Sequence, residues 1–474
     1  MRGLAFIATA VVLVTAQGVL AQNAVHPSLT AGERTVMAAA LQGGEERTVA
    51  PAEAFSDSEL EAALMRHATV ELGLRVAPGD VDPLWAIMPP RRQVAAEYAQ
   101  ARHAGRLELW LQSLSPASAS YRALVAAGYR YRQIVANGGW SRRPMTLDLR
   151  LGAAGRAVVD LRSRLAVEGY LVEVGEGAEV FDVALRDAVA TFQRHHDLEA
   201  DGIVGRETRE ALNVTAEQRL AQIEANLERW RWVRSLPPDR LEVNVAAAQA
   251  VLYADDAPTL TMRTVVGDLR HHTPMFTSRL ASVVINPPWN VPASIATNEL
   301  WPKEAAQPGY LGRNGFSTVN GALRQAPGPR NSLGRLKFDF PSPFGVYLHD
   351  TPGRDAFARS NRALSHGCIR LEKPRELAAA LLAPSWTADQ IDAAIDSGQT
   401  QRVQLDGRLP LFVLYWTVTP QDDGSLQFHP DRYGWDAKLM TALARKSAVS
   451  ARHAFADTDC AAKSPSRIRH TQGA

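Results

Sequence analysis

Two short segments, Tyr347-Leu348-His349-Asp350 and Ser365-His366-Gly367-Cys368-Ile369-Arg370, decide how the rest of the chain is interpreted. They place a cysteine directly after a glycine, beside one histidine and a short span after another. A nucleophilic thiol needs a nearby base, donors for a developing oxyanion and room for a substrate. Gly367 leaves that room, because a backbone without a Cβ can approach a ligand closely. Fifteen residues separate His349 from Ser365, which is enough for a loop that joins two strand ends.

The region around these segments has the apolar pattern of β structure. From Arg240 onward the period is two, and strands are predicted at 241–245, 251–253, 261–266, 282–286, 336–340 and 346–349. A late run, 411–418, is continuous enough to be a buried strand. Helices are predicted at 374–382 and 388–395, just after the cysteine. Many short strands with turn signals favour a β sandwich or a barrel-like domain.

A long insertion interrupts these strands between 289–292 and 327–329. It covers about 293–330 and contains Trp301, Tyr310 and several glycines. A segment this long inside a β domain is usually functional, so we expect a lid.

The residues from Pro144 to Asn213 have the pattern of a small separate unit. Two amphipathic stretches carry apolar residues at helical spacing, and the turn-rich run Asp201-Gly202-Ile203-Val204-Gly205-Arg206-Glu207-Thr208 leads into a last helix that ends at Leu212. The pair His195-His196 is compatible with metal binding. Neighbouring residues on a helix point to different faces, however, so a solvated helix end is the prediction.

The first part of the mature chain, residues 22–145, is rich in Ala, Glu, Arg and Leu and is predicted to be mostly helical. Ser56 followed by Glu59 predicts a helix N-cap. Five aromatic residues are expected in the core rather than on a binding surface: Trp85, Tyr98, Trp110, Tyr129 and Tyr131. Farther on, residues 216–233 predict a connecting helix that ends before Leu236-Pro237-Pro238.

The two ends of the chain differ from the rest in composition. Residues 1–21 have a short positive start, an apolar run and a small-residue cleavage pattern, which predict a secretory signal. An uncleaved membrane anchor is the alternative. Residues 446–474 contain few large apolar side chains and are predicted to be disordered.

Composition excludes some classes of function. The chain has 474 residues, 22% charged and 46% hydrophobic, which is typical of a soluble protein of several domains. Its net charge of +2 gives no support for nucleic-acid binding. There are two cysteines, Cys368 and Cys460. A disulfide between them is an alternative in an oxidising compartment, although it would consume the thiol whose surroundings look catalytic.

These segments together resemble a known family. The pattern of His349, fifteen residues and then Ser-His-Gly-Cys-Ile-Arg is similar to the L,D-transpeptidase catalytic domain, as are 286–292, 331–335 and 347–352. The run that ends in Asp-Gly-Ile-Val-Gly-Arg-Glu-Thr resembles a three-helix peptidoglycan-binding domain. The order of parts resembles the large periplasmic members found in Gram-negative bacteria.

The resemblance implies an α+β multidomain protein with defined parts. These are a signal peptide (1–21), a helical N-terminal scaffold region (22–145), a peptidoglycan-binding domain (146–214), a linker helix (215–238), a mostly-β catalytic domain (239–445) with a lid-like insertion (293–330), and a disordered tail (446–474). It also implies a periplasmic location.

The resemblance assigns roles to the residues of the two opening segments. Cys368 is the expected nucleophile and His349 the general base, oriented by a backbone carbonyl such as that of Asp350. His366 would line the site, and the N–H groups of Gly367 and Cys368 are candidates for the oxyanion hole. The expected substrate-binding residues are Arg370, for a carboxylate; Tyr347 and Trp289, for the groove; Ser365, which would hold the loop; and Asp350.

The implied reaction needs no cofactor and no metal. A neighbouring imidazolium would lower the pKa of the thiol. The thiolate would attack a donor tetrapeptide stem between diaminopimelate and D-Ala, and the thioester would pass to the diaminopimelate amine of an acceptor stem. The expected partners are peptidoglycan stem peptides and glycan, with other cell-wall synthesis enzymes as candidates. Oligomeric state is not implied.

Several alternatives stay open on the sequence alone. Cys368 could be a buried inert thiol, His349 a core histidine and Arg370 half of an ordinary ion pair. His349, His366 and Cys368 are all zinc-ligand types, although no companion zinc pattern is present. Water as the acceptor would make the protein an L,D-carboxypeptidase, and a protein lysine would make it an anchoring enzyme. A wall-binding scaffold without activity is the non-enzymatic alternative.

Overall fold

The computed structural model describes residues 28–43, 55–140, 145–171, 178–407 and 409–446. The expected signal peptide, the expected disordered tail from residue 447 and Cys460 lie outside these ranges. Contacts group the chain into two units, residues 1–65 and 66–474. Among the helices that the structure describes, none is long and apolar enough to cross a membrane.

The first unit contains α1 (Ala31–Gly43) and most of α2 (Asp57–Glu71). Ser56 caps α2 as predicted: its N–H donates to Glu59 Oε2 at 2.7 Å, and Glu59 N–H donates back to Ser56 Oγ at 3.3 Å. The side chains of Met37, Leu60 and Leu64 in these two helices are fully buried. The reciprocal cap satisfies N–H groups that the first turn of a helix leaves without partners.

The second unit begins with a helical region: α3 (Pro78–Val81), α4 (Val94–His103), α5 (Leu107–Gln112) and α6 (Ala119–Ala136). Four of the five aromatic residues expected in the core are buried, and Tyr129 is half-buried. Trp85 packs against Trp232 and Trp435, with ring centroids 5.9 and 5.5 Å away. Its strand segment also exchanges backbone hydrogen bonds with Met275. The segment around Trp85 is therefore bonded to the chain just before β4.

The three expected helices between residues 144 and 213 are α7 (Arg156–Val167), α8 (Val183–Arg194) and α9 (Arg206–Leu212). They bury one apolar core that includes Leu161, Leu185 and Phe192. The Gln193 amide closes the turn before α9, because it donates to Asp201 Oδ1 and accepts from the N–H of Gly202, both at 2.8 Å. The Gln193 side chain therefore fixes the Asp201-Gly202 turn.

The prediction that His195-His196 forms a solvated helix end is wrong for His196. Its side chain is 4% exposed and stacks between Phe192 and Phe428, with centroids 3.9 and 5.3 Å away. The physical reason is a tertiary contact invisible in the local sequence. The hairpin of β15 (Val418–Pro420) and β16 (Leu426–Phe428) covers this helix end.

Helix α10 (Ala216–Val233) has the predicted bounds and begins with a capping box between Thr215 and Gln218. It is buried over most of its length and packs against α6. Gln222 donates to the carbonyls of Thr417 and His429 at 3.0 and 2.9 Å. The connecting helix is thus bonded directly to the β-rich part of the chain.

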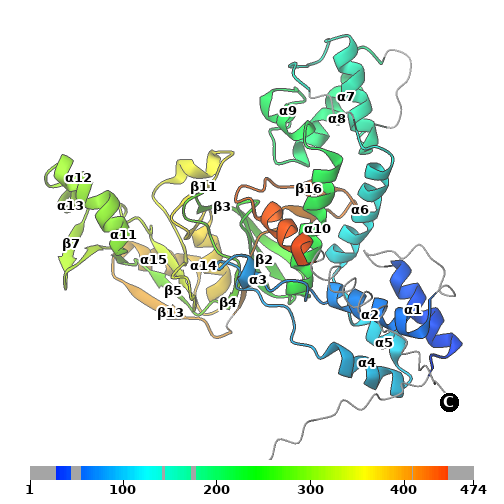
Figure 1. Ribbon diagram of the computed structural model, residues 1–474. Helices are drawn as coiled ribbons and strands as arrows, with labels where there is room; N and C mark the ends of the chain where they lie inside the picture. The colour runs from blue at the N-terminus through cyan, green and yellow to red at the C-terminus, as the bar shows by residue number, and fades with distance from the viewer. Residues whose placement is uncertain (1–27, 44–54, 141–144, 172–177, 408, 447–474) are drawn as a thin grey trace, which may run out of the picture. The chain divides into compact units, whose positions relative to one another are not determined.

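That part contains a mixed sheet rather than a sandwich of two separate sheets. Its strand order is β13-β5-β9-β10-β12-β3-β2-β1-β14-β4, and β11 pairs with β3. Figure 1 labels β13, β5, β3, β2, β4 and β11 of this sheet. The strands are β1 (Arg240–Asn244), β2 (Gln249–Ala254), β3 (Ala257–Gly267), β4 (Phe276–Arg279), β5 (Ser282–Ile285), β9 (Leu336–Asp339), β10 (Leu348–His349), β11 (Ala363–Ser365), β12 (Ile369–Leu371), β13 (Gln401–Gln404) and β14 (Pro410–Leu414). The helices predicted after the cysteine are α14 (Pro374–Leu382) and α15 (Ala388–Asp396).

The prediction of one strand over 411–418 is wrong. This run contains most of β14 and the first residue of β15, which belongs to a different sheet. Between the two strands, side chains form the hydrogen bonds of the backbone N–H and carbonyl groups. Asn244 accepts from Trp416 N–H and donates to its carbonyl, both at 3.0 Å, and Asn226 accepts from Thr417 N–H at 3.0 Å. The chain therefore leaves the sheet without losing hydrogen bonds in a buried place.

The insertion is a folded unit with its own core. It contains α11 (Ala293–Ile295), the π-helix η2 (Ala296–Leu300), α12 (Trp301–Ala306) and α13 (Tyr310–Arg313). A small sheet joins β6 (Trp289–Asn290), β8 (Ala322–Gln325) and β7 (Phe316–Val319). Leu300, Leu311, Phe316 and Leu323 are buried together.

Candidate active site

Strand pairing brings the two decisive segments side by side. β10 and β12 are parallel, with Leu348 opposite Ile369 and His349 opposite Arg370. Ile369 N–H donates to Tyr347 O at 3.0 Å. Tyr347 and Cys368 each precede their strand by one residue, so they are lateral neighbours at one end of the pair.

The Ser365–Cys368 loop is held by two hydroxyl groups. Ser365 Oγ donates to the carbonyl of Cys368 at 2.6 Å and accepts from Gly367 N–H at 3.1 Å. Thr273 Oγ1 donates to Gly367 O at 2.9 Å and accepts from Gly267 N–H at 2.8 Å. Ser365 thus lies where a loop-holding residue is expected. Gly367 has φ +102°, which favours glycine over any other residue.

One consequence concerns the expected oxyanion hole. The N–H of Gly367 is engaged by Ser365 Oγ and does not point freely into the site. Of the two N–H groups named from the sequence, the N–H of Cys368 remains the candidate.

The Cys368 thiol is half-buried and not in a disulfide. Burial raises its pKa above the ordinary value, although the N–H and hydroxyl of Tyr347 and the charges of Lys337 and Arg370 oppose that rise. Each of these four groups stabilises the thiolate. The thiol is thus protonated at rest and poised to lose its proton when the site becomes more favourable to charge.

His349 is buried beside this thiol segment and is held neutral. Burial, and then the charge of Arg370, lower its pKa to about 3. Its Nδ1 lies 2.5 Å from the carbonyl of Asp350, so Nδ1 carries the proton and Nε2 the lone pair. The predicted orientation by Asp350 is observed. The prediction that an imidazolium lowers the pKa of the thiol is wrong at this histidine, because the nearby cations are Lys337 and Arg370.

Tyr347 connects several side chains around the thiol. Lys337 Nζ lies 4.5 Å from its ring centroid, the ring of His349 is 5.6 Å away, and Trp289 interacts with its hydroxyl. Burial raises the pKa of the phenol, so it remains a hydrogen-bond donor. Trp289 and Tyr347 therefore lie together near the cysteine, and their part in a substrate groove stays a prediction.

Arg370 has no salt bridge to a carboxylate within the described part of the chain. Burial lowers its pKa, and the main opposing influence is the Cys368 thiol. The alternative of an ordinary ion pair does not hold among these residues. A guanidinium next to the Cys368 thiol without a protein carboxylate suits an anionic ligand group.

His366 contacts the insertion. Its Nε2 lies 2.6 Å from Oε1 of Glu299, and both side chains are 37% exposed. The His271 ring is 4.7 Å from the His366 ring, and Asp268 lies 3.0 Å from His271 Nδ1. Glu299 belongs to η2, and short π-helices are frequent at functional sites. The insertion thus reaches the residue two positions before Cys368.

Sequence reasoning missed Glu299, Lys337 and Thr273. Lys337 alternates in β9 with Phe338, and nothing in that alternation marks it as a neighbour of Cys368. Glu299 lies in an insertion without a motif, and Thr273 follows the pair His271-His272. Of those two, His271 is exposed and the His272 ring stacks on the Tyr433 ring, with centroids 4.0 Å apart.

No group of three or more His, Cys, Asp or Glu side chains arranged to hold a metal ion occurs in the described ranges. His349 is bonded to a carbonyl and His366 to a carboxylate. The two histidines therefore serve different partners in this arrangement.

Two family models match this chain, one in the β-rich part and one in the three-helix unit. The family model described as "L,D-transpeptidase catalytic domain" matches residues 238–395, and the model described as "Putative peptidoglycan binding domain" matches residues 154–212. The chain thus contains an L,D-transpeptidase catalytic domain joined to a peptidoglycan-binding domain. The second of these is the three-helix unit, and the first contains Cys368.

A curated relative agrees with this assignment. A protein of Haemophilus influenzae, named "Putative L,D-transpeptidase", is 34% identical over 222 residues, which are 42% of this chain and 45% of the relative. The match therefore spans less than half the length of that relative.

Similar solved structures are also L,D-transpeptidases, at low overall similarity. One from Xylanimonas cellulosilytica is 15% identical and covers 57% of this chain and 99% of its own, with a TM-score of 0.17. L,D-transpeptidase 3 from Mycobacterium tuberculosis is 12% identical and covers 38% and 61%, with a TM-score of 0.20. TM-scores this low carry no argument, so the assignment rests on the family models and the curated relative.

Proposed function

We propose that this protein is a peptidoglycan L,D-transpeptidase that forms 3-3 cross-links through Cys368. The observation that carries the proposal is the surroundings of the thiol within the matched catalytic domain. Tyr347, Lys337 and Arg370 all favour the thiolate, and a neutral His349 is fixed beside the same strand pair.

The donor half-reaction follows from these groups. Sulfur attacks the carbonyl between diaminopimelate and D-Ala of a tetrapeptide stem, and a C–S bond replaces the C–N bond. The proton of the thiol passes through His349 Nε2 to the departing amine of D-Ala. The low pKa of His349 makes it a brief carrier rather than a store of the proton. The N–H of Cys368 and the hydroxyl of Tyr347 are suited to the transient oxyanion.

The acceptor half-reaction reverses this path. The diaminopimelate amine of a second stem attacks the thioester, a C–N bond replaces the C–S bond, and the proton of the amine returns to sulfur. One amide is exchanged for another, so no external energy source is required. Arg370 supplies a cation for a stem carboxylate near the nucleophile.

The insertion favours an amine over water as the acceptor. Its Glu299 meets His366 at the mouth of the site, and a covering element excludes water from a reactive thioester. Hydrolysis to a tripeptide and transfer to a protein lysine are the alternative outcomes for the same acyl-enzyme.

We also propose that the protein works in the periplasm, on stem peptides and glycan strands. The pattern of residues 1–21 and the match of residues 154–212 to a peptidoglycan-binding domain support this location and these partners.

Intact-protein mass spectrometry tests the proposal. After brief exposure to a disaccharide-tetrapeptide, the protein should gain the mass of the donor minus D-Ala, and Cys368→Ala should gain nothing. Ser278→Ala, a surface variant outside the site, serves as a matched control that should be acylated normally. An adduct of equal size on Cys368→Ala would refute the role of the thiol.

A further inference from the structure

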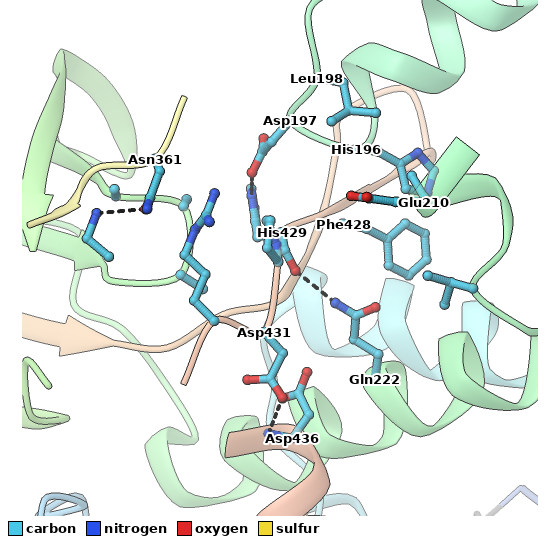
Figure 2. Close-up of a pocket in the computed structure, with 18 of the residues that line it drawn as sticks. His196, Asp197, Leu198, Glu210, Gln222, Asn361, Phe428, His429, Asp431 and Asp436 are labelled. Atoms are coloured by element: carbon cyan, nitrogen blue, oxygen red, sulfur yellow. Dashed lines mark hydrogen bonds and ion pairs between the residues drawn. The ribbon is translucent and has the colours of Figure 1, made fainter. Parts of the chain in front are cut away.

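A cavity of about 810 Å³ lies away from Cys368, where the three-helix domain, α10 and the catalytic domain meet (Figure 2). None of the residues predicted for the active site lines it. Its walls come from residues 196–198 just after α8, from α9 and α10, from the turn 245–248, and from segments 360–363 and 428–432. Its volume is in the range of natural ligand sites.

The walls of this cavity are fixed by specific contacts. Phe428 N–H donates to His195 O at 2.7 Å, and His429 Nδ1 lies 2.5 Å from Asp197 Oδ2. Arg219 of α10 lies over the ring of Phe428, 4.6 Å from its centroid. These bonds join the peptidoglycan-binding domain to the catalytic domain beside the opening, so the cavity is part of the folded unit.

One wall of the cavity is acidic. Glu207 and Glu210 are exposed side chains of α9, and Figure 2 shows Glu210 directed into the cavity. Glu210 pairs with Arg206 at 3.0 Å, but these side chains are 63% and 83% exposed. Such an exposed pair is weak, so a ligand can displace it.

Another part of the lining carries two arginines. Arg362 and Arg432 both belong to the catalytic domain and are close enough to affect one another, and Arg362 also interacts with the charge of Asp197, a further lining residue. Arg362 is anchored, because it donates to the carbonyls of Arg359 and Ala247 at 3.1 and 3.0 Å. Arg432 is exposed. Ala247 and neighbouring short side chains form an apolar floor between the charged walls.

We propose that this cavity binds the zwitterionic amino-acid end of a peptidoglycan stem, the carbon that carries both an ammonium and a carboxylate. Glu207 and Glu210 receive the ammonium, Arg362 and Arg432 receive the carboxylate, and the alkyl chain lies on the alanine floor. The inference rests on the proposed function for the identity of the stem. The charge pattern itself requires only a ligand with both charges.

The place of the cavity in the chain gives this site a role. Segment 360–363 continues through β11 directly into the Ser365–Cys368 loop. A stem held in the cavity is therefore bound to the same segment that carries the nucleophile. The site would hold the enzyme on stems that carry a free diamino-acid end.

Calorimetry with the full chain carrying Cys368→Ala tests the proposal without turnover. The probe is a disaccharide-tripeptide with a free diaminopimelate end, compared with probes whose end amine is acetylated or whose end carboxyl is amidated. Glu207→Gln with Glu210→Gln, and separately Arg432→Gln, should each weaken binding of the free probe about tenfold. Asp187→Asn, a surface carboxylate of the same three-helix domain outside the cavity, should leave binding unchanged.

The capped probes identify the ligand chemistry. The variant with Glu207→Gln and Glu210→Gln should bind the acetylated probe and the free probe equally well. Arg432→Gln should bind the amidated probe and the free probe equally well. Unchanged affinity of the cavity variants would overturn the proposal. So would binding of a disaccharide without peptide that responds to the same substitutions, because the ligand would then be glycan.

A parallel assay of product formation by the same cavity variants with Cys368 intact separates the two proposals. Dimer formation with unchanged stem affinity refutes the cavity alone. Absence of any dimer or acyl-enzyme from the unsubstituted chain refutes the proposed function, while the affinity comparison still decides whether the cavity binds a zwitterion.

Discussion

Replacing Ser365 with alanine should loosen the nucleophile loop by a predictable amount. Ser365 is 2% exposed, and its hydroxyl serves both the carbonyl of Cys368 and the N–H of Gly367. Ser365→Ala leaves one acceptor and one donor without a partner, and a buried polar group in that state costs about 1–3 kcal/mol. Thr273 still holds the carbonyl of Gly367, so partial relaxation favours the lower end of that range, about 1–1.5 kcal/mol for each of the two groups. The expected cost is about 2–3 kcal/mol.

Hydrogen exchange is the appropriate assay, because a chain with several domains need not unfold in one step. A cost of about 2–3 kcal/mol corresponds to a loss of protection of roughly 30- to 150-fold. The loss should be confined to peptides that contain residues 365–369. Ser278→Ala is the matched control, since its hydroxyl donates one bond to Pro341 O at an exposed position. Unchanged protection of the loop in Ser365→Ala would refute this account of how the nucleophile is held.

Three further predictions concern the charges of the site. The alkylation rate of Cys368 should rise with an inflection above the ordinary thiol pKa, and Lys337→Met should move that inflection higher, because a cation that favours the thiolate is lost. The buried neutral His349 has a pKa of about 3 against an ordinary value of 6.5, so the unfolded chain binds more protons between these values. Stability should therefore fall as the pH drops from 6.5 towards 3, by up to about 1.4 kcal/mol per pH unit, and His349→Asn should remove this part of the dependence in denaturant titrations. Glu299→Gln breaks the contact between the insertion and His366. Both side chains are 37% exposed, so this contact is worth about 0.2–1 kcal/mol. Because its loss frees the insertion from the site, alkylation of Cys368 should accelerate roughly 1.4- to 5-fold.

Each of these has a contradicting result. An alkylation inflection that stays in place in Lys337→Met would remove the lysine from the electrostatics of the thiol. Parallel stability curves for His349→Asn and the unsubstituted chain would mean that His349 is not buried neutral. If Glu299→Gln and His366→Asn accelerate alkylation additively in the double variant, the two side chains do not act as a pair.

Periodicity predicted the parts of the fold that depend on local sequence. Helices 216–233 and 374–382 have the predicted bounds because capping residues and prolines mark their ends. The break between β14 and β15 was not predictable, since it depends on the distant side chains of Asn226 and Asn244. The same holds for His196, which is covered by a hairpin more than two hundred residues later.

The candidate site could be predicted where one segment contains the chemistry. Cys368, Tyr347 and the Asp350 carbonyl that orients His349 are in or next to paired strands that the sequence marks clearly. The charge state of His349 could not be predicted, because it follows from complete burial next to Arg370. Glu299 was also invisible, since only the folded insertion brings it to His366.

The most direct test of the central claim is product analysis after incubating residues 22–474 with a disaccharide-tetrapeptide. The account predicts a cross-linked dimer lighter by one D-Ala than two monomers, absent with Cys368→Ala. A tripeptide monomer as the sole product would replace transpeptidation with hydrolysis. A dimer formed equally well by Cys368→Ala would contradict the account.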